Sequence, residues 1–430
     1  MTEERLIEFE GWKDTKPTKP LTVRKRRKEE SCADGSLLEP GKDDLLLSRG
    51  GTLSTMGHIH SYSTANYIGN KREIAEQLIL ILEKYEVEYN SVFDAFSGSG
   101  VVSLLFALME KEVVSNDLLT GSALQAECLL NVNPSILTEA DWMFLINNRP
   151  ADLVPIRVKD LYPNWGKLLT EEEVDFLDRF RTNLCLRFGN ACQIGQCLSG
   201  EGAAQNFLRL DGRLVNRCDP RIALALYALV MHINSHCFVG GRYYNGQTLA
   251  KLSHRLEHQQ NGGLQFFQTL YDHTAHRLQF PAPLRTMKNS RTVYNADIIE
   301  LLDSGLVKAD LLYLDPPYGG EASDYVYKYQ FLEEYLQGGQ LSDRTKSGGK
   351  RFDKKKGFAE QFNDLLDRCG NFPAWLISFN ATSFAKLDDI VDLVKKFRPN
   401  VVVEDTAKLY KYRKERTIAT DKEFLILART

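Results

Sequence analysis

The stretch 91-SVFDAFSGSGVVSLLFALMEKEVVSND-117 decides the fold. Residues 91–110 begin as an apolar strand, pass through a glycine-containing turn and continue as a helix. Residues 112–117 then form a short strand that ends in an acid. A strand, a turn, a helix and a second strand within about 30 residues are the signature of a βαβ unit. The stretch therefore predicts an α/β fold with a parallel sheet.

The rest of the chain divides into three kinds of sequence. Residues 1–60 show little periodicity and include the basic run 24-RKRRKEE-30, so we expect a flexible arm there. Helical patterns dominate residues 121–285, which we interpret as a mainly helical insertion between strands of the sheet. The α/β domain then consists of residues 61–120 and 286–430. We expect helices at 71–85, 171–188, 221–233, 358–370 and 383–397, and strands at 291–302, 309–315, 374–379, 400–405 and 423–428.

Composition limits the class of function. The chain has 430 residues, 43% of them hydrophobic and 26% charged, which is typical of a soluble protein with two or three cores. Its formal net charge is −3, so any affinity for nucleic acid must come from local basic patches. No apolar run approaches the roughly 20 residues that span a bilayer. Eight scattered cysteines without a CxxC pair indicate reduced thiols in a cytoplasmic protein.

The first candidate site is the turn 94-DAFSGSG-100 together with Asp117. Glycine carries no Cβ, so a ligand can approach the backbone of such a turn closely. In parallel sheets ligands bind at the carboxyl ends of strands, where Asp117 can accept hydrogen bonds from both hydroxyls of a ribose. The sequence has neither a full GxGxxG for a pyrophosphate nor a P-loop. It therefore predicts an unphosphorylated nucleoside as the ligand, with a purely structural turn as the alternative.

The second candidate site is 315-DPPY-318, which follows the apolar strand 311-LLYL-314. The two prolines fix φ at about −65°, and the first of them is confined to an extended conformation because a proline follows it. The Asp315 carboxylate and the Pro316 carbonyl are two fixed acceptors, which match the two N–H donors of an exocyclic amino group. Tyr318 can stack on the attached base. The motif predicts that an NH2 nitrogen is presented as a nucleophile, and a plain strand-ending turn is the alternative.

Two pairs of histidines have the spacing of metal ligands on one helix face. They are His232 with His236 and His254 with His258. No matching third and fourth ligands are visible in the sequence, so we expect no metal site.

Taken in order, these motifs resemble those of the S-adenosylmethionine-dependent DNA adenine-N6 methyltransferases of the Dam-like D12 class, or α group. The segment 67-YIGNK-71 is similar to the family's first motif, an aromatic-x-G-x-K pattern, and 297-DIIELL-302 to the motif that precedes DPPY. The segment 234-NSHCFVGGRYYNGQ-247 is similar to the one that leads into the family's DNA-contacting hairpin. The resemblance covers about residues 67–430. It implies a Rossmann-like class I methyltransferase sheet, mostly parallel with an antiparallel last strand, and makes 121–285 the target-recognition region.

The resemblance also implies roles for single residues. Tyr67 should pack on the adenine of the cofactor, Lys71 should pair with its carboxylate, and Asp117 should hold its ribose. The turn Phe96–Gly100 should pass under the methionine moiety, and Asp297 should lie near the adenine. The implied cofactor is S-adenosylmethionine, without a metal. The implied cofactor-binding residues are Tyr67, Lys71, Asp94, Phe96, Ser97, Gly98, Ser99, Gly100, Asp117, Asp297 and Asp315, and the catalytic ones are Asp315, Pro316, Pro317 and Tyr318.

The implied reaction is methyl transfer to N6 of an adenine that has been flipped out of double-stranded DNA. Asp315 should lie near both the methyl sulfonium and the amino group, so that alignment and electrostatics supply most of the catalysis. Phosphate contacts need local positive charge. Residues 341–356 carry seven basic and two acidic side chains, and residues 408–416 carry five and one. A solvated surface is the alternative for each run. The predicted DNA-binding residues are Arg242, Tyr243, Tyr244, Asn245, Lys350, Arg351, Lys411 and Arg413.

Other functions remain open at this point. An RNA-base or protein-glutamine N-methyltransferase could use the same turn, an N4-cytosine enzyme is a weaker variant, and a non-catalytic nucleic-acid-binding relative is a third class. The order of the motifs and the large insertion favour DNA. We expect a bacterial or phage-encoded cytoplasmic enzyme, monomeric or weakly dimeric, either solitary or paired with a cognate restriction endonuclease.

Overall fold

A computed structural model describes most of the α/β domain and part of the predicted insertion. The described residues are 71–151, 153, 157–161, 171–188, 220–239, 242–243, 284, 287–317, 325–337, 346, 348, 352, 357–380, 385–406 and 423–430. The chain separates into two compact units, residues 1–46 and 47–430, and every described residue lies in the second.

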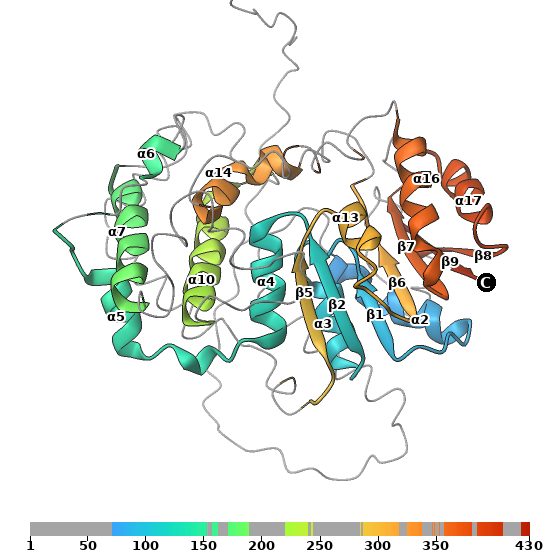
Figure 1. Ribbon diagram of the computed structural model, residues 1–430, viewed down its shortest axis with the longest axis horizontal. Coiled ribbons are helices and arrows are strands. Elements are labelled where there is room, and N and C mark those ends of the chain that lie inside the picture. The colour runs from blue at the N-terminus through green and yellow to red at the C-terminus, as the bar shows by residue number, and fades with distance from the viewer. Residues whose placement is uncertain are drawn as a thin grey trace, which may run out of the picture. The chain divides into compact units, whose positions relative to one another are not determined.

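A seven-stranded sheet with the strand order β5-β2-β1-β6-β7-β9-β8 lies at the centre of the fold (Figure 1). β1, β2, β5, β6 and β7 are parallel to one another, and β9 runs antiparallel to both β7 and β8. This confirms the predicted sheet, which was mostly parallel with an antiparallel last strand. The strands are β1 Ser91–Asp94, β2 Glu112–Asp117, β5 Arg291–Asn295, β6 Leu311–Leu314, β7 Ala374–Asn380, β8 Asn400–Asp405 and β9 Glu423–Arg429; β3 Phe238–Val239 and β4 Arg242–Tyr243 form a separate antiparallel pair.

Helices cover both faces of the sheet and extend beyond one of its edges (Figure 1). None in the described part of the chain is long and apolar enough to cross a membrane. The α-helices are α2 Ala75–Lys84, α3 Val101–Leu108, α4 Thr120–Asn131, α5 Glu139–Asn147, α6 Val158–Leu161, α7 Glu171–Phe188, α10 Pro220–Cys237, α13 Ile298–Asp303, α14 Tyr325–Gln337, α16 Phe358–Arg368 and α17 Leu387–Lys395, and the 3-10 helices are η1 Lys71–Ile74, η2 Pro134–Ile136 and η6 Cys369–Asn371.

The central strands contribute side chains to two hydrophobic cores, because neighbouring side chains in a strand point to opposite faces of the sheet. Val92, Leu311 and Tyr313 join the core that contains α2 and α3. Phe93 and Leu312 join the core that contains α13, α16 and α17. β6 is buried along its whole length, which explains why LLYL is a continuous apolar run rather than an alternating one.

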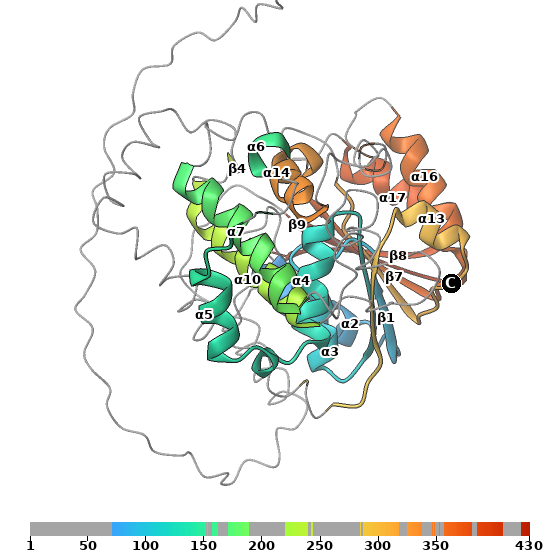
Figure 2. The same cartoon turned by 60° about the vertical axis from the view of Figure 1, so that its left-hand side comes forward.

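α4 lies between the sheet and a helical block that we define as α5, α7, α10 and α14 (Figure 2). Ala123, Ala126 and Leu130 of α4 join the core beside the sheet, whereas Leu124 and Cys128 join the core of the helical block. A helix that is buried on nearly every side is expected where two cores meet. α4 therefore joins the sheet to the helical block.

α14 belongs to the helical block although it follows DPPY in the sequence. Phe331 and Tyr335 of α14 share one buried core with Phe176 and Tyr227 of α7 and α10. The Tyr335 hydroxyl donates a 2.9 Å hydrogen bond to the Leu177 carbonyl. The block is thus not built from residues 121–285 alone, and the domain limits predicted from the sequence stay a prediction.

One predicted strand is wrong in its second half. The strand expected at 291–302 ends at Asn295, and Ile298–Asp303 is α13. The Asp297 carboxylate accepts hydrogen bonds from the backbone N–H groups of Ile299 and Glu300, so this acid is a helix N-cap. The run IIELL fits a buried strand and a buried helix equally well by periodicity, and the cap decides between them.

Candidate active site

The predicted site residues of four strands meet at the carboxyl ends of these strands, which we call one edge of the sheet. In the parallel register Asp94 lies opposite Ser115 and Tyr313, and Asp117 lies opposite Asn295. Because parallel strands end at the same edge, the last residues of β1, β2 and β5 and the DPP segment after β6 come together. The structure thus assembles one site from stretches that are far apart in the sequence.

The glycine turn after β1 is fixed by hydrogen bonds to β2. The Ser97 N–H donates to the Asn116 carbonyl at 2.8 Å, and the Gly98 N–H donates to Asp117 Oδ2 at 2.8 Å. Gly98 and Gly100 have φ values of 49° and 71°, which glycine adopts without strain. A Cβ on Gly100 would also lie only 3.3 Å from the Leu129 side chain. The conformation of the turn therefore favours glycine at both positions, and close packing favours it at Gly100 as well.

Asp117 holds the turn through both oxygens of its carboxylate. Its Oδ1 accepts a 2.8 Å hydrogen bond from the Leu119 N–H, and its Oδ2 accepts the bond from Gly98. Burial raises the pKa of this carboxyl to about 6, against the lowering effect of these backbone bonds. The Leu118 N–H and the Ser122 side chain are further hydrogen-bond partners of this carboxyl, and they also lower its pKa. The predicted contact of Asp117 with a ribose stays a prediction.

Asp94 is fully buried, and only one of its two carboxylate oxygens has a hydrogen-bond partner among the described residues. Its Oδ2 accepts a 2.6 Å hydrogen bond from the Ser103 hydroxyl, whereas its Oδ1 has no hydrogen-bond partner among the described residues. The hydroxyl of Ser97, in the adjacent glycine turn, is also buried and unpaired within the described part of the chain. Burial is the main cause that raises the pKa of Asp94 to about 7; the hydrogen bond from Ser103 opposes this shift, and the nearby carboxylates of Asp315 and Asp117 add to it. Such orphaned buried groups mark a place where a polar ligand can supply partners.

The raised pKa of Asp94 makes a prediction about pH and stability. A carboxyl group whose pKa is higher in the folded than in the unfolded protein stabilises the fold below the unfolded value of about 4, and this contribution is lost as the pH rises through about 7. We therefore expect cofactor-free Asp94→Asn protein to become more stable than the wild type between pH 5 and pH 8, by roughly 2–4 kcal/mol in the free energy of unfolding. Denaturant unfolding at several pH values measures this difference.

Asp310 provides the control for that experiment. Its carboxylate accepts hydrogen bonds from Asn90 and Ser91, which lower its pKa. The stability difference between Asp310→Asn and the wild type should therefore stay constant from pH 5 to pH 8, since this group titrates below that range. A constant difference for Asp94→Asn as well would contradict a neutral, buried Asp94.

Asp315 lies next to a cation shared by two carboxylates. Lys71 Nζ lies 2.9 Å from Asp315 Oδ2 and 2.9 Å from Glu423 Oε1, and all three side chains are at most one-fifth exposed. Burial alone would lower the pKa of Lys71, but the carboxylates of Asp315 and Glu423 raise it above its ordinary value. Lys71 is therefore a permanent cation beside the DPPY motif. The ion pairs of Lys71 with Asp315 and Glu423 are observed. The predicted contact of Lys71 with the cofactor carboxylate stays a prediction.

A second set of hydrogen bonds orients the other oxygen of Asp315. The Ser378 hydroxyl on β7 donates to Asp315 Oδ1 at 3.1 Å, and Ser378 Oγ lies 2.7 Å from the Tyr313 hydroxyl. Burial raises the pKa of Asp315, and Lys71 opposes this shift. Pro316 is buried and Pro317 partly buried, as expected for a rigid turn that ends a central strand. The carboxylate of DPPY thus has one oxygen beside a cation and one beside a hydroxyl.

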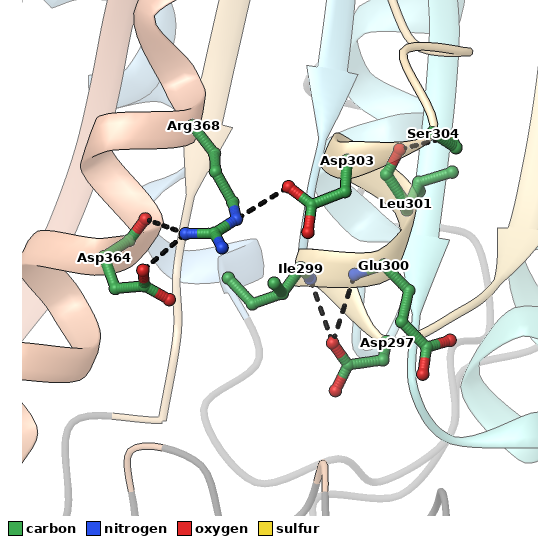
Figure 3. A network of polar contacts seen from close by, with 8 residues as sticks. All are labelled: Asp297, Ile299, Glu300, Leu301, Asp303, Ser304, Asp364 and Arg368. Carbon is green, nitrogen blue, oxygen red and sulfur yellow. Dashed lines mark hydrogen bonds and ion pairs between the residues drawn. The ribbon is translucent and has the colours of Figure 1, made fainter.

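Asp297 lies at the other side of this edge, at the start of α13. Figure 3 shows its carboxylate capping the helix, and Arg368 of α16 bridging Asp303 and Asp364. A Cβ on Gly348 would lie 2.8 Å from Asp297 Oδ2, so the backbone at Gly348 comes close to this acid. The predicted contact of Asp297 with the cofactor's adenine stays a prediction.

Several predicted residues cannot be placed in the site. Tyr67 and Tyr318 lie outside the described residues, as do Tyr244, Asn245, Lys350, Arg351, Lys411 and Arg413. Arg242 and Tyr243 form β4, of which only the backbone is described. The described residues include no group of three or more His, Cys, Asp or Glu side chains that could hold a metal ion.

Sequence reasoning missed several residues that build the site. Asn116 and Asn295 tie β1, β2 and β5 together: the Asn116 amide donates to the Ala95 and Ala296 carbonyls, and Asn295 donates to the Asp117 and Leu118 carbonyls. Glu423, Ser378 and Glu333 are the others. The position of the two asparagines at strand ends was a usable signal, since polar residues there favour a site. Nothing local marked the other three.

Comparison with known proteins shows which protein family the chain is similar to. Residues 67–151 match the model of the D12 class N6 adenine-specific DNA methyltransferase family. The chain carries a D12 class N6 adenine-specific DNA methyltransferase domain. The match contains Lys71, the glycine turn and Asp117. It confirms the resemblance seen in the motifs, and with it the predicted activity, DNA adenine-N6 methylation. For the methyltransferase this implies S-adenosylmethionine as cofactor and DNA as substrate.

Two relatives of the methyltransferase extend the likeness over most of the chain. The type II methyltransferase M2.HphI of Haemophilus parahaemolyticus is 25% identical over 351 residues, which cover 81% of this chain and 93% of the relative. The modification methylase LlaI of Lactococcus lactis subsp. lactis is 23% identical over 372 residues, which cover 80% of this chain and 51% of the relative. DPPY and three helices of the helical block, α7, α10 and α14, lie beyond the family-model match, and the longer alignments reach further along the chain than that match does.

Proposed function

We propose that the methyltransferase transfers the methyl group of S-adenosylmethionine to N6 of an adenine flipped out of double-stranded DNA, with Asp315 as the central catalytic residue. The observation that carries this proposal is the position of Asp315. It follows a fully buried strand, and it lies beside the Lys71 ammonium and the Ser378 hydroxyl at the edge where Asp94 and Asp117 also lie.

The carboxyl groups at the carboxyl ends of the strands suit a positively charged nucleoside. Four carboxyl groups, of Asp94, Asp117, Asp315 and Glu423, lie at these strand ends, and Lys71 forms ion pairs with two of them, Asp315 and Glu423. When bound, S-adenosylmethionine supplies an electrophilic methyl group on a cationic sulfonium. In our proposal Asp117 accepts the ribose hydroxyls, the turn Phe96–Gly100 lies under the methionine part, and the unpaired Asp94 Oδ1 accepts from its ammonium group. Such contacts would satisfy buried acceptors that otherwise destabilise the fold.

The DPP segment then orients the adenine amino group. Asp315 and the carbonyl of Pro316 each accept one N–H of the amino group, which aims the nitrogen lone pair away from them and toward the methyl group. The amino nitrogen becomes acidic after transfer, so water or the Asp315 carboxylate takes the proton. Tyr318 would stack on the base. Alignment and electrostatic stabilisation supply most of the rate in this scheme, and no metal is needed.

The finer biological role is also a proposal. We propose that residues 121–285 read the DNA sequence, that Arg242 and the basic runs 341–356 and 408–416 contact phosphates, and that the enzyme acts in the cytoplasm as a monomer or weak dimer. A pairing with a restriction endonuclease is supported by the names of the two relatives, a type II methyltransferase and a modification methylase.

A labelling experiment tests the proposed substrate. The protein is incubated with S-adenosylmethionine labelled in the methyl group and, in separate reactions, with unmethylated duplex DNA, RNA or cell-extract protein. We expect label in DNA as N6-methyladenine and none above background in the other two substrates. Label only in RNA or protein would overturn the proposal in favour of the same fold acting on another amine or amide, and N4-methylcytosine would point to the cytosine-specific variant.

A further inference from the structure

The turn that carries Asp117 leads directly into α4, whose first turn has an unusual cap. The N-cap residue is Leu119, and its side chain makes no capping hydrogen bond. Leucine is a poor N-cap because it has no acceptor for the first backbone N–H groups of a helix, which otherwise remain unpaired. Some other group must therefore supply these acceptors at a buried helix start.

Glu333 of α14 supplies them from far away in the sequence. Its Oε2 accepts a 2.7 Å hydrogen bond from the Thr120 N–H, and its Oε1 accepts a 2.8 Å hydrogen bond from the Gly121 N–H. A carboxylate at this place also interacts favourably with the helix dipole. Both oxygens of one side chain thus bind two successive N–H groups of α4.

The arrangement has costs that a simple helix cap would avoid. Glu333 is 1% exposed, and burial raises the pKa of its carboxyl to about 7 against the lowering effect of its bonds to Gly121 and Thr120. A Cβ on Gly121 would lie 3.3 Å from Glu333 Oε1 and 3.5 Å from the Leu336 side chain. Glycine at position 121 therefore permits the close approach of α14, although glycine weakens a helix.

The turn between β2 and α4 is consequently held by two acids and one amide. Asp117 accepts from Leu119, Glu333 accepts from the next two N–H groups, and the Asn295 amide donates to the Asp117 carbonyl at 3.0 Å. α14 is itself held by the helical block, because the Arg181 guanidinium on α7 donates to the Tyr335 carbonyl. The orientation of the Asp117 carboxylate therefore depends on where α14 places Glu333.

We propose that Glu333 is a positioning residue for cofactor binding, which caps α4 across the fold and so fixes the Asp117 carboxylate for the ribose. The inference rests on the ribose contact proposed for Asp117. It assigns to the helix after DPPY a function in the cofactor site that its position in the sequence does not suggest. Glu333 need not touch the cofactor for this function.

The test uses the full-length protein and the variant Glu333→Gln. A glutamine keeps one carbonyl acceptor but turns an NH2 group toward the second N–H of α4, so the shape is retained and the cap is half lost. The matched control is Glu334→Gln, since Glu334 is the adjacent buried acid on α14 and accepts a hydrogen bond from Gln330 within the same helix. Binding of S-adenosylhomocysteine and of its 3′-deoxy analogue is measured by titration calorimetry, and methyl transfer to duplex DNA gives kcat and KM.

We expect the wild type to bind the 3′-deoxy analogue about tenfold more weakly, the loss typical of one hydrogen bond to a charged group. Glu333→Gln should bind S-adenosylhomocysteine about tenfold more weakly and lose most of its discrimination between the two ligands. It should raise KM for S-adenosylmethionine more than it lowers kcat. Glu334→Gln should behave as the wild type in all of these measurements.

Two results would overturn the inference. One is an unchanged affinity of Glu333→Gln for S-adenosylhomocysteine. The other is an equal loss of affinity for both ligands with the discrimination intact, which would mean general destabilisation rather than positioning of Asp117. The variant Asp117→Asn separates the inference from the proposed function. If it binds S-adenosylhomocysteine normally and still discriminates against the 3′-deoxy analogue, the ribose contact is wrong and the inference fails with it. Transfer of label to DNA by the wild type would still support the proposed function.

Discussion

Asp315→Ala is expected to lower the rate of methyl transfer to duplex DNA by at least about 10³-fold at saturating S-adenosylmethionine. The change removes the acceptor that we propose for the adenine amino group and the negative charge beside the methyl sulfonium. The fold should survive the change, because Lys71 keeps Glu423 as a partner at 2.9 Å. The rate is measured as transfer of labelled methyl groups, and cofactor affinity is measured separately by calorimetry, where we expect a smaller change.

Asp310→Ala is the matched control for this variant. Asp310 precedes the same strand, β6, but lies at its opposite end, where its carboxylate accepts hydrogen bonds from Asn90 and Ser91. Its replacement should lower the melting temperature somewhat and leave the turnover of the folded enzyme nearly unchanged. Equal turnover of Asp315→Ala and Asp310→Ala would refute the role given to Asp315.

Lys71→Met is expected to have the largest effect on stability. It leaves the carboxylates of Asp315 and Glu423 without their shared cation at a largely buried place. Removing one partner of a buried ion pair costs about 3–5 kcal/mol of unfolding free energy, since the remaining charge stays uncompensated. The pKa of Asp315 should also rise, because Lys71 lowers it. Denaturant unfolding at pH 8 measures the stability, and the pH dependence of kcat should move to higher pH.

A second substitution separates charge from packing in this test. If the loss comes from repulsion and unpaired charge, Glu423→Gln in the Lys71→Met background should restore part of the stability. Lys84→Met is the control, because Lys84 pairs with Glu404 of the neighbouring strand β8 but its side chain is half exposed. It should cost little, since solvent screens exposed ion pairs. A Lys71→Met protein as stable as Lys84→Met would show that the two carboxylates do not depend on Lys71.

The local motifs were readable because each is built from adjacent residues. FSGSG needs its glycines for backbone conformation. Asp117 is the last residue of β2, and Asp315 directly follows the apolar strand β6. Parallel pairing then brings the strand ends to one edge as a general rule of such sheets. The long helices at 171–188 and 221–233 could be predicted from the helical spacing of their apolar residues. The antiparallel last strand was predicted only through the resemblance to the D12 class methyltransferases. The segment 297–302 was misassigned because its period fits both a strand and a helix.

Only the tertiary structure decided which residues far apart in the sequence form ion pairs and hydrogen bonds with each other. Lys71 has two carboxylate partners, one in DPPY and one at the start of the last strand, and only the sheet order places Glu423 beside Asp315. Glu333 is one of two adjacent acids on α14, and only the packing of that helix against α4 selects it as the cap. The sequence by itself determined which chemistry this edge of the sheet can perform, because backbone conformation and strand ends are local properties. The folded chain decided which charges are compensated and which turns are held, because those depend on contacts between residues that only folding brings together.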